Sequence, residues 1–339
     1  MIKKTETNYC LKKNNTFGIN VKCNTLHRVK SENDIFQVLN SNNFNKENFL
    51  ILGGGSNILF TKNFDGSIIK NEIRGKKIIQ ECEESISVKV GAGENWHDLV
   101  LWSVKKNLSG LENLALIPGN VGAAPIQNIG AYGAEVKDVI VKVFAISVKD
   151  ITQKQYLNKH CYFEYRDSIF KQKLKNKVII THVIFKLSKK PKLNTTYSGI
   201  KEEIKKQNVE VTTKSIFNAV IKIRSEKLPD PKVIGNCGSF FKNPIISLKK
   251  FESIEKKFPE IINYKTKDGK IKIAAAWMIE SCGWKGYRSG DAGVHSNQSL
   301  VLVNYGKSSG DEILDLSKEI IKSVKKKFDI TLNPEVNII

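Results

Sequence analysis

The stretch IPGNVGAAPIQNIGAYG, residues 117–133, lies in the uncharged window 113–134 of a chain in which 26% of residues are charged. Two prolines and four glycines exclude a membrane span, which needs about 20 predominantly apolar residues. They also exclude an ordinary helix, because Gly costs about 1 kcal/mol and Pro about 3 kcal/mol in a helix interior. The stretch predicts either an irregular loop through the core or a backbone-rich loop that holds an anionic cofactor.

The composition sets the limits for the rest of the chain. Its 339 residues, 40% of them hydrophobic, are enough for two or three domains with substantial cores. Neither a signal-peptide pattern nor a membrane-span window is found, so we expect a cytoplasmic protein. The six cysteines form no CxxC pair and the five histidines are dispersed, which predicts reduced thiols and no metal site.

The net charge of +21 suggests a nucleic-acid partner or an attraction for small phosphate-bearing ligands. The densest cluster, Lys322 with Lys325, Lys326 and Lys327, lies in a predicted helix. Its apolar positions predict one buried stripe with the lysines largely on the solvated side: Ile313, Leu316, Ile320, Ile321, Val324 and Phe328. No nucleic-acid-binding motif accompanies the lysines. We therefore expect no nucleic-acid or membrane partner, and a monomer.

The pattern along the chain is mixed α and β, without repeats. Helix starts and helical spacing predict helices after Ser31 and over residues 95–106 and 215–224, the last ended by the prolines at 229 and 231. Apolar runs and alternation predict strands at 49–52, 86–90, 139–148 and 178–187. Domain boundaries are expected near residues 75 and 225.

Two motifs lie outside this loop in the first two thirds of the chain. GGGSN at 53–57 follows a predicted strand but is neither GxGxxG nor a Walker A loop, so it is either a glycine turn or a set of bare amides for phosphate. Ser56 and Asn57 would add side-chain contacts. Arg166 in YRDSIF either holds a carboxylate through two parallel donors or pairs with Asp167.

Two further features lie in the last third. Ser239 stands in GNCGSFFKNP, residues 235–244, where it resembles a constrained polar tip in a dry pocket but not an esterase elbow. Cys237 beside it reads as a packing residue. Glu335 in NPE is a lone carboxylate near the end of the chain, and such a residue is usually solvated. Each feature is ambiguous alone.

Taken in order, these motifs are similar to one family. The chain closely resembles the UDP-N-acetylenolpyruvoylglucosamine reductase (MurB) family, type I, over essentially its whole length, through NTFGI (15–19), LILGGGSNILF (50–60), VGAGENWHDLV (90–100), GLENLALIPGNVGAAPIQNIGAYG (110–133), YRDSIFK (165–171), KLPDPKVIGNCGSFFKNP (227–244), HSNQSLVLVN (295–304) and PEV (334–336).

The resemblance implies an α+β, three-domain FAD-binding flavoenzyme of the vanillyl-alcohol oxidase/PCMH kind with a C-terminal MurB substrate domain. Residues 1–75 would form the first FAD-binding subdomain, to which the tail 329–339 could return. Residues 76–225 would form the second subdomain, with a substrate lid near Tyr197. Residues 226–328 would form the substrate-binding domain.

The implied activity is that of a UDP-N-acetylmuramate dehydrogenase. NADPH reduces FAD, which then reduces UDP-N-acetyl-3-O-(1-carboxyvinyl)-glucosamine to UDP-N-acetylmuramate in peptidoglycan precursor synthesis. Ser239 matches the family's proton donor for the substrate carbon C2. Arg166 and Glu335 match the residues that polarise the substrate carboxylate.

The resemblance also implies binding residues. Tyr197 would close over the UDP portion, while Lys227, Asn243 and Gln298 would meet the diphosphate. Because Ala123 and Ala124 stand where relatives carry serines, backbone amides would have to supply more contacts there. The residues expected to bind FAD are Gly53, Gly54, Gly55, Ser56, Asn57, Pro118, Gly119, Gly122, Ala123, Ala124, Gln127, Asn128, Gly130, Tyr132, Gly133 and Arg224.

Three other functions compete with this one. A different FAD enzyme of the same fold, such as an alcohol oxidase, would have no reason to keep Ser239, Arg166 and Glu335. A basic binding protein without flavin would be colourless. An inactive member of the family would bind FAD without turnover.

Overall fold

A computed structural model of the chain describes residues 5–266 and 268–339, which form two compact units. Unit 1 holds the described residues up to Tyr9, together with Cys23–Gly54 and Asp65–Glu226. Unit 2 holds Cys10–Lys22, Gly55–Phe64 and Lys227–Ile339. The GGGSN motif is thus divided, since Gly54 ends one segment of unit 1 and the next residue begins a segment of unit 2. The three-part division near residues 75 and 225 stays a prediction.

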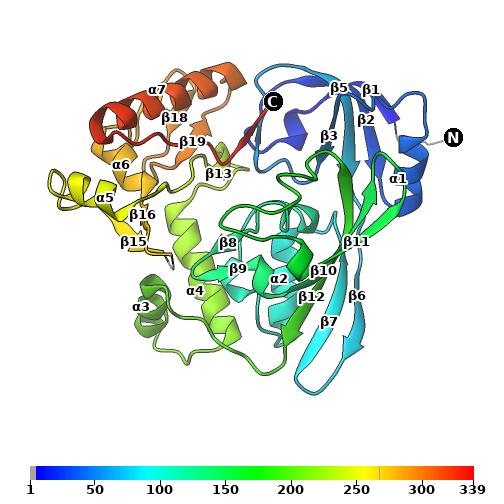
Figure 1. Cartoon of the computed structure of the whole chain (residues 1–339), viewed down its shortest axis with the longest axis horizontal. Coiled ribbons are helices and arrows are strands. Elements are labelled where there is room, and N and C mark those ends of the chain that lie inside the picture. Colours follow the sequence, from blue (N-terminus) through cyan, green and yellow to red (C-terminus); the bar gives the residue numbers. More distant parts are fainter. Residues whose placement is uncertain (1–4, 267) are drawn as a thin grey trace. The chain divides into compact units, whose positions relative to one another are not determined.

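The first sheet of unit 1 has four strands in the order β1-β2-β5-β3 (Figure 1). Their bounds are Thr5–Cys10 (β1), Lys22–Val29 (β2), Phe64–Asn71 (β5) and Phe49–Leu52 (β3). Strands β3 and β5 are parallel and place Leu52 opposite Lys70, directly before the glycines. The sheet therefore delivers the start of GGGSN beside the end of β5.

Helix α1 (Glu32–Leu39) begins where the sequence predicts. The Ser31 hydroxyl accepts a hydrogen bond from the Asp34 amide at 3.1 Å, and the Asp34 carboxylate accepts one from the Ser31 amide at 3.1 Å. This capping box satisfies two amides that the first helical turn leaves without partners. Ile35, Val38 and Leu39 lie buried on the inner face, as their helical spacing requires.

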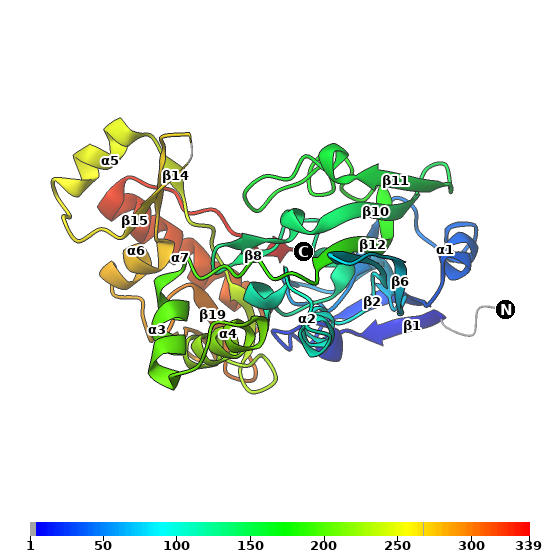
Figure 2. The ribbon, with the colours of Figure 1, turned by 90° about the horizontal axis from the view of Figure 1, so that it is seen from below.

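The second sheet of unit 1 is antiparallel, in the order β11-β10-β12-β7-β6 (Figures 1 and 2). It confirms the strands expected near 86–90, 139–148 and 178–187. The remaining elements of this unit are β6 (Lys76–Glu81), β7 (Ser85–Gly91), α2 (Trp96–Lys105), β8 (Gly130–Ala131), β9 (Ala134–Glu135), β10 (Ile140–Ser147), β11 (Gln153–Leu157), β12 (Val178–Ser188), α3 (Ser198–Gln207) and α4 (Thr213–Lys227).

The core of unit 1 is anchored by Trp96, the first residue of α2. Its ring packs edge-on against Phe185 of β12 with centroids 6.0 Å apart, and its indole N–H donates to the Leu114 carbonyl at 2.8 Å. A buried Trp needs such an acceptor for its N–H group. The hydrogen bond also holds the chain just before residues 117–133 against the sheet.

Unit 2 contains a four-stranded sheet in the order β13-β19-β18-β17 and a three-stranded sheet in the order β14-β16-β15. Figure 1 shows α7 lying along β18 and β19. The elements are β4 (Ile58–Leu59), β13 (Gly235–Ser239), β14 (Ile245–Ile246), α5 (Leu248–Glu255), β15 (Asn263–Lys265), β16 (Ile271–Ile273), α6 (Ala275–Ser281), β17 (Arg288–Ser289), β18 (Ala292–Val294), β19 (Val301–Asn304), α7 (Gly310–Phe328) and β20 (Asn337–Ile338).

Helix α7 confirms the predicted stripe. Its inner face is buried and its five lysines are exposed, so the densest positive cluster is a solvated helix face. Each buried apolar side chain contributes about 1.5–3 kcal/mol. The buried members of the predicted stripe are Ile313, Leu316, Ile320, Val324 and Phe328.

A parallel pair closes unit 2 across a long sequence separation. Strand β20 pairs with β4, with Asn337 opposite Ile58 and Ile338 opposite Leu59. The segment that carries Glu335 is thereby tied to the residues after GGGSN. In the part of the chain that the structure describes, no helix is both long and apolar enough to cross a membrane.

Candidate functional site

The loop 117–133 docks onto the residues that precede α2. The Val121 amide donates to the Glu94 carbonyl at 2.9 Å, and the Gly122 amide donates to the Ala92 carbonyl at 2.8 Å. A Cβ on Gly122 would lie 2.7 Å from the Ala92 Cβ, so only glycine allows this approach. The loop is therefore both packed against the core and rich in exposed backbone.

One expectation about this loop is not supported. The amides of Ala123 and Ala124 were expected to supply extra cofactor contacts, but they donate to the carbonyls of Asn120 (3.0 Å) and Val121 (3.1 Å). The reason is that residues 121–123 form a turn of 3-10 helix, which uses these donors internally. Any compensation for the missing serines must come from another part of the loop.

The two glycine-rich segments meet backbone to backbone. A Cβ on Gly54 would lie 2.8 Å from Gly119 Cα and 3.1 Å from Asn120 Oδ1. Among the residues that the structure describes, no acceptor receives a hydrogen bond from the amide N–H of Gly54 or of Gly119. Adjacent bare amides of this kind form anion-binding concavities. Both residues were predicted from sequence to bind the cofactor.

A buried guanidinium lies near the end of the same loop. Arg224 of α4 hydrogen-bonds the Tyr132 side chain, and burial lowers the pKa of Arg224 while it raises that of Tyr132. The Arg224 Nε atom is buried and has no hydrogen-bond partner within residues 5–266 and 268–339. A buried donor without a partner costs about 1–3 kcal/mol. This atom is therefore available to a polar group of a ligand.

Arg166 is carried by a tight turn. The amides of Glu164 and Asp167 donate to each other's carbonyls at 3.1 and 3.3 Å, and Arg166 between them has a left-handed φ of 56°. The Asn128 side chain donates to the Glu164 carbonyl at 3.0 Å. A Cβ on Gly130 would lie 3.5 Å from Arg166 Nη1, so the guanidinium lies against loop 117–133. The turn brings together residues that are 36 positions apart.

Tyr197 lies against the same loop. Its ring packs edge-on against Tyr132, with centroids 4.9 Å apart. The Asn113 side chain donates to the carbonyls of Tyr132 and Asn194 at 3.0 Å each, and the Asn194 side chain donates to the Gly133 carbonyl at 2.9 Å. Unit 1 therefore gathers the predicted lid tyrosine, both arginines and the end of the loop.

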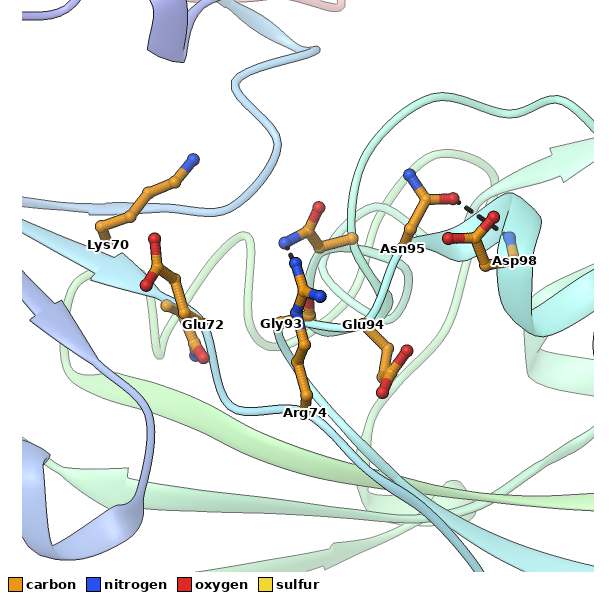
Figure 3. Close-up of a pocket in the computed structure, with 9 residues that line it drawn as sticks. Lys70, Glu72, Arg74, Gly93, Glu94, Asn95 and Asp98 are labelled. Carbon is orange, nitrogen blue, oxygen red and sulfur yellow. Dashed lines mark hydrogen bonds between the residues drawn. The ribbon is translucent and has the colours of Figure 1, made fainter.

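A polar pocket of about 240 Å³ opens on the other side of the loop (Figure 3). Figure 3 shows Lys70 and Glu72 along one side of it, and Asn95 and Asp98 along the other. The Lys70 ammonium donates to the Gly53 carbonyl. The residues that line the pocket are Lys70, Asn71, Glu72, Arg74, Gly93, Glu94, Asn95, Asp98 and Asn120.

Unit 2 brings Ser239 and Glu335 together. Ser239 is exposed at the end of β13, and the amide of Glu335 donates to the carbonyl of the adjacent Phe240 at 2.7 Å. Gly238, with a φ of 73°, sets the direction of the chain just before the serine. Cys237 is buried, and burial and then Glu335 raise the pKa of its thiol, which agrees with a packing residue rather than a nucleophile.

The second half of GGGSN also lies in unit 2. A Cβ on Gly55 would lie 2.0 Å from the Asn14 carbonyl oxygen, and its φ of 68° also requires glycine. The Asn57 side chain donates to the Glu335 carbonyl at 3.4 Å. Ser56 lies between them, half-buried. This segment therefore holds the C-terminal stretch that carries the predicted catalytic carboxylate.

The predicted substrate-binding residues of unit 2 differ in which of their polar atoms are already used in hydrogen bonds. Asn243 uses its oxygen to accept from the Ala275 amide at 2.9 Å, which leaves its NH₂ group for a ligand. Gln298 accepts from the Leu300 amide at 3.3 Å in the same way. Lys227 is exposed at the end of α4. Arg166 belongs to unit 1, whereas Ser239 and Glu335 belong to unit 2.

Sequence reasoning missed three residues of these clusters. Lys70, Asn113 and Asn194 make their contacts with backbone carbonyls, which no motif reveals. One signal was available for the lysine, because it directly follows the apolar pair at 68–69 and so places a charge next to a buried stretch. For the two asparagines we find no signal beyond their position in or near loops.

Comparisons with known proteins decide the family. Residues 25–149 match the family described as FAD binding domain, and residues 230–339 match the one described as UDP-N-acetylenolpyruvoylglucosamine reductase, C-terminal domain. The chain is 50% identical over 336 residues to the UDP-N-acetylenolpyruvoylglucosamine reductase of Flavobacterium johnsoniae, which covers 98% of this chain and 99% of that relative. The chain belongs to the UDP-N-acetylenolpyruvoylglucosamine reductase family.

Other members of this family agree with that assignment. The reductase of Pseudomonas aeruginosa is 39% identical over 97% of both chains. The crystal structure of MurB from Thermus caldophilus superimposes with a TM-score of 0.67 over 97% of both chains at 22% identity, which supports the fold. The α+β FAD-binding fold with a C-terminal MurB domain, expected from the resemblance, is confirmed.

Proposed function

We propose that this chain reduces UDP-N-acetyl-3-O-(1-carboxyvinyl)-glucosamine to UDP-N-acetylmuramate with FAD and NADPH, a step in the synthesis of peptidoglycan precursors. The observation that carries the proposal is the 50% identity to a named reductase over 98% of the chain. The local geometry supports it, because Ser239 and Glu335 lie on neighbouring backbone segments of unit 2.

The residues of unit 1 fit FAD. Bare amides at Gly54 and Gly119 suit a diphosphate, and the unpartnered Nε of Arg224 suits a polar edge of the flavin. Bound FAD would accept a hydride from NADPH and pass it to the substrate alkene. The uncharged loop 117–133 provides a dry surface for the ring, since its side chains carry no charge.

The catalytic residues act on the charge that this hydride creates. Addition at C3 of the enolpyruvyl group builds negative charge at C2 and on its carboxylate. Arg166 meets that carboxylate with a permanent charge and two parallel donors, and Glu335 avoids repelling it when it holds a proton. Ser239 then gives its proton to C2, which is a strong enough base to take it from a hydroxyl.

Substrate binding follows from the same arrangement. Lys227, Asn243 and Gln298 would bind the diphosphate. The side-chain oxygens of Asn243 and Gln298 already accept hydrogen bonds from backbone amides, and their NH₂ groups would donate to the diphosphate. Tyr197 would fold over the UDP portion as a lid. The protein would act as a monomer.

One experiment tests the proposal. The purified protein should be yellow, should bleach anaerobically with NADPH and should regain its colour when the enolpyruvyl sugar nucleotide is added. Simple alcohols serve as the control, because an alcohol oxidase would respond to them instead. A colourless protein that does not bind added FAD, or a flavin that the sugar nucleotide leaves reduced, would overturn the proposal.

A further inference from the structure

Lys70 occupies an unusual position for a lysine. It is the half-buried penultimate residue of β5, and its ammonium donates to the carbonyl of Gly53, the first glycine of GGGSN. The neighbouring Gly54 is the residue whose backbone touches Gly119. Lys70 therefore supports the point where the two glycine-rich segments meet, from the side of the polar pocket (Figure 3).

The positive charge of Lys70 is not balanced by a carboxylate of its own. Burial lowers its pKa to about 8, opposed by attraction to Glu72 and assisted by repulsion from Arg28. The Glu72 carboxylate is already engaged by Arg28 Nη1 at 2.7 Å. Of the other charged residues of the pocket, Glu94 binds Lys76 at 2.8 Å, while Arg74 and Asp98 lie farther along the lining. In the described part of the chain no carboxylate forms an ion pair with the Lys70 ammonium.

The contact with Gly53 acts on the neighbouring amide. In a trans peptide the C=O and N–H groups point in opposite directions. An ammonium bound to the Gly53 oxygen therefore fixes the orientation of the Gly54 N–H and makes it a stronger donor. That N–H has no acceptor among the described residues. An anion bound there would lie across the peptide from the Lys70 ammonium and would feel its charge mainly through the polarised peptide group.

We propose that Lys70 is a positioning residue of the cofactor site, which orients the Gly53–Gly54 peptide and supplies the positive charge that a nucleoside diphosphate on the Gly54 amide requires. The inference rests on the proposed function, because it takes FAD as the ligand. Stability alone does not explain a lysine here, since its half-buried charge forms no ion pair within the described residues.

The test measures FAD binding to the apoprotein by flavin fluorescence between pH 7 and 9.5. In the wild type, affinity should fall as pH rises through about 8, because the free protein loses the Lys70 proton there and binding must restore it. Lys70→Met should bind FAD about 10- to 100-fold more weakly at pH 7, without that pH dependence. Lys70→Arg should keep both the affinity and a flat profile, because its charge persists.

A stability measurement separates positioning from mere packing. The Lys70→Met apoprotein should unfold at the same temperature as the wild type or higher, because an uncompensated buried cation has been removed. Lys77→Met, on the exposed side of β6, is the matched control and should leave FAD affinity unchanged. A wild type whose affinity does not change with pH, or a Lys70→Met variant that binds FAD normally, would overturn the inference.

These outcomes are distinct from failure of the proposed function. If the chain is no FAD-dependent reductase, the wild type itself will neither bind FAD nor turn over the enolpyruvyl sugar nucleotide. If only the role of Lys70 is wrong, the wild type will do both and Lys70→Met will bind FAD as tightly as it does.

Discussion

The loop 117–133 of unit 1 and the strand end at Ser239 of unit 2 hold their functional groups in opposite ways. The loop acts through its backbone, so a methyl group on Gly54 or Gly122 already collides with a neighbour at 2.8 or 2.7 Å. Ser239, the proposed proton donor, presents an exposed side chain on a strand that is held by other residues. We therefore expect cofactor binding to depend on the shape of the backbone. Proton transfer should depend on one atom, the hydroxyl oxygen of Ser239.

The largest effect is expected for Ser239→Ala. Turnover should fall about 10²- to 10⁴-fold, because the proton donor is lost while the strand remains. Stopped-flow absorbance should show normal bleaching by NADPH and a failure of the enolpyruvyl substrate to restore colour. Ser253→Ala, an exposed serine on α5, is the control. If the enolpyruvyl substrate reoxidised the flavin of Ser239→Ala normally, Ser239 would not be the proton donor, and the contrast between the two regions would be wrong.

Adjacent glycines provide the next test. Gly54→Ala should destabilise the protein by about 1–3 kcal/mol and lower its FAD content, because the new Cβ would lie 2.8 Å from Gly119 Cα. Gly53→Ala is the matched control, since its Cβ would meet Asn120 Cβ at an ordinary 3.5 Å. Thermal unfolding measures the stability of the two variants, and the ratio of flavin to protein absorbance measures their FAD content. Equal behaviour of the two variants would mean that the backbone contact has no importance.

Tyr197→Phe tests the lid with a smaller change. The variant keeps the ring that packs on Tyr132 but loses the hydroxyl, so KM for the sugar nucleotide should rise about 5- to 20-fold while FAD binding stays normal. Steady-state kinetics check this. An unchanged KM would argue against a lid role and would leave Tyr197 as part of the packing around the loop.

The smallest effect is expected in the pH dependence of FAD affinity, through His97 at the start of the loop. The Leu116 amide donates to His97 Nδ1 at 3.2 Å, and burial lowers the pKa of His97, opposed by Asp98 and assisted by Arg224. Neutral His97 accepts this bond, so its contribution is present above the unfolded pKa of about 6.5 and is lost as pH falls below it.

FAD affinity should therefore decrease several-fold between pH 7 and 5, and this decrease should be smaller in His97→Gln. Titration of the apoprotein with FAD at each pH measures it. A His97→Gln profile that parallels the wild type would assign the acid sensitivity to other groups.

Much of the fold follows from local sequence signals. The start of α1 rests on Ser31 and Asp34, and the buried face of α7 on apolar spacing, and both were predicted because the signals lie within a few residues of each other. Helix α3 was missed because Ser198–Gln207 is mostly Lys, Glu and Gln with only two isoleucines. Helix α4 extends to Lys227, beyond the predicted end at 224, because only the prolines that follow end it.

The sequence predicts residues for the site but not the contacts that surround them. The motif blocks indicated Arg166, Ser239 and Glu335 through resemblance to a family. The approach of Gly54 to Gly119 and the packing of Tyr197 on Tyr132 join residues about 65 positions apart, and no local pattern encodes such distances. The internal use of the Ala123 and Ala124 amides was missed because a short 3-10 turn has little sequence signature.

The pairing of β20 with β4 has a consequence for how the protein is made. Ile58 emerges from the ribosome 279 residues before its partner Asn337, so this pair cannot form until the chain through Ile338 has been made. Long-range pairing of this kind slows folding and leaves strand edges exposed in the nascent chain. Glu335 lies two residues before that strand, so the segment that carries the proposed catalytic carboxylate can dock on the residues after GGGSN only after this long-range pair has become available.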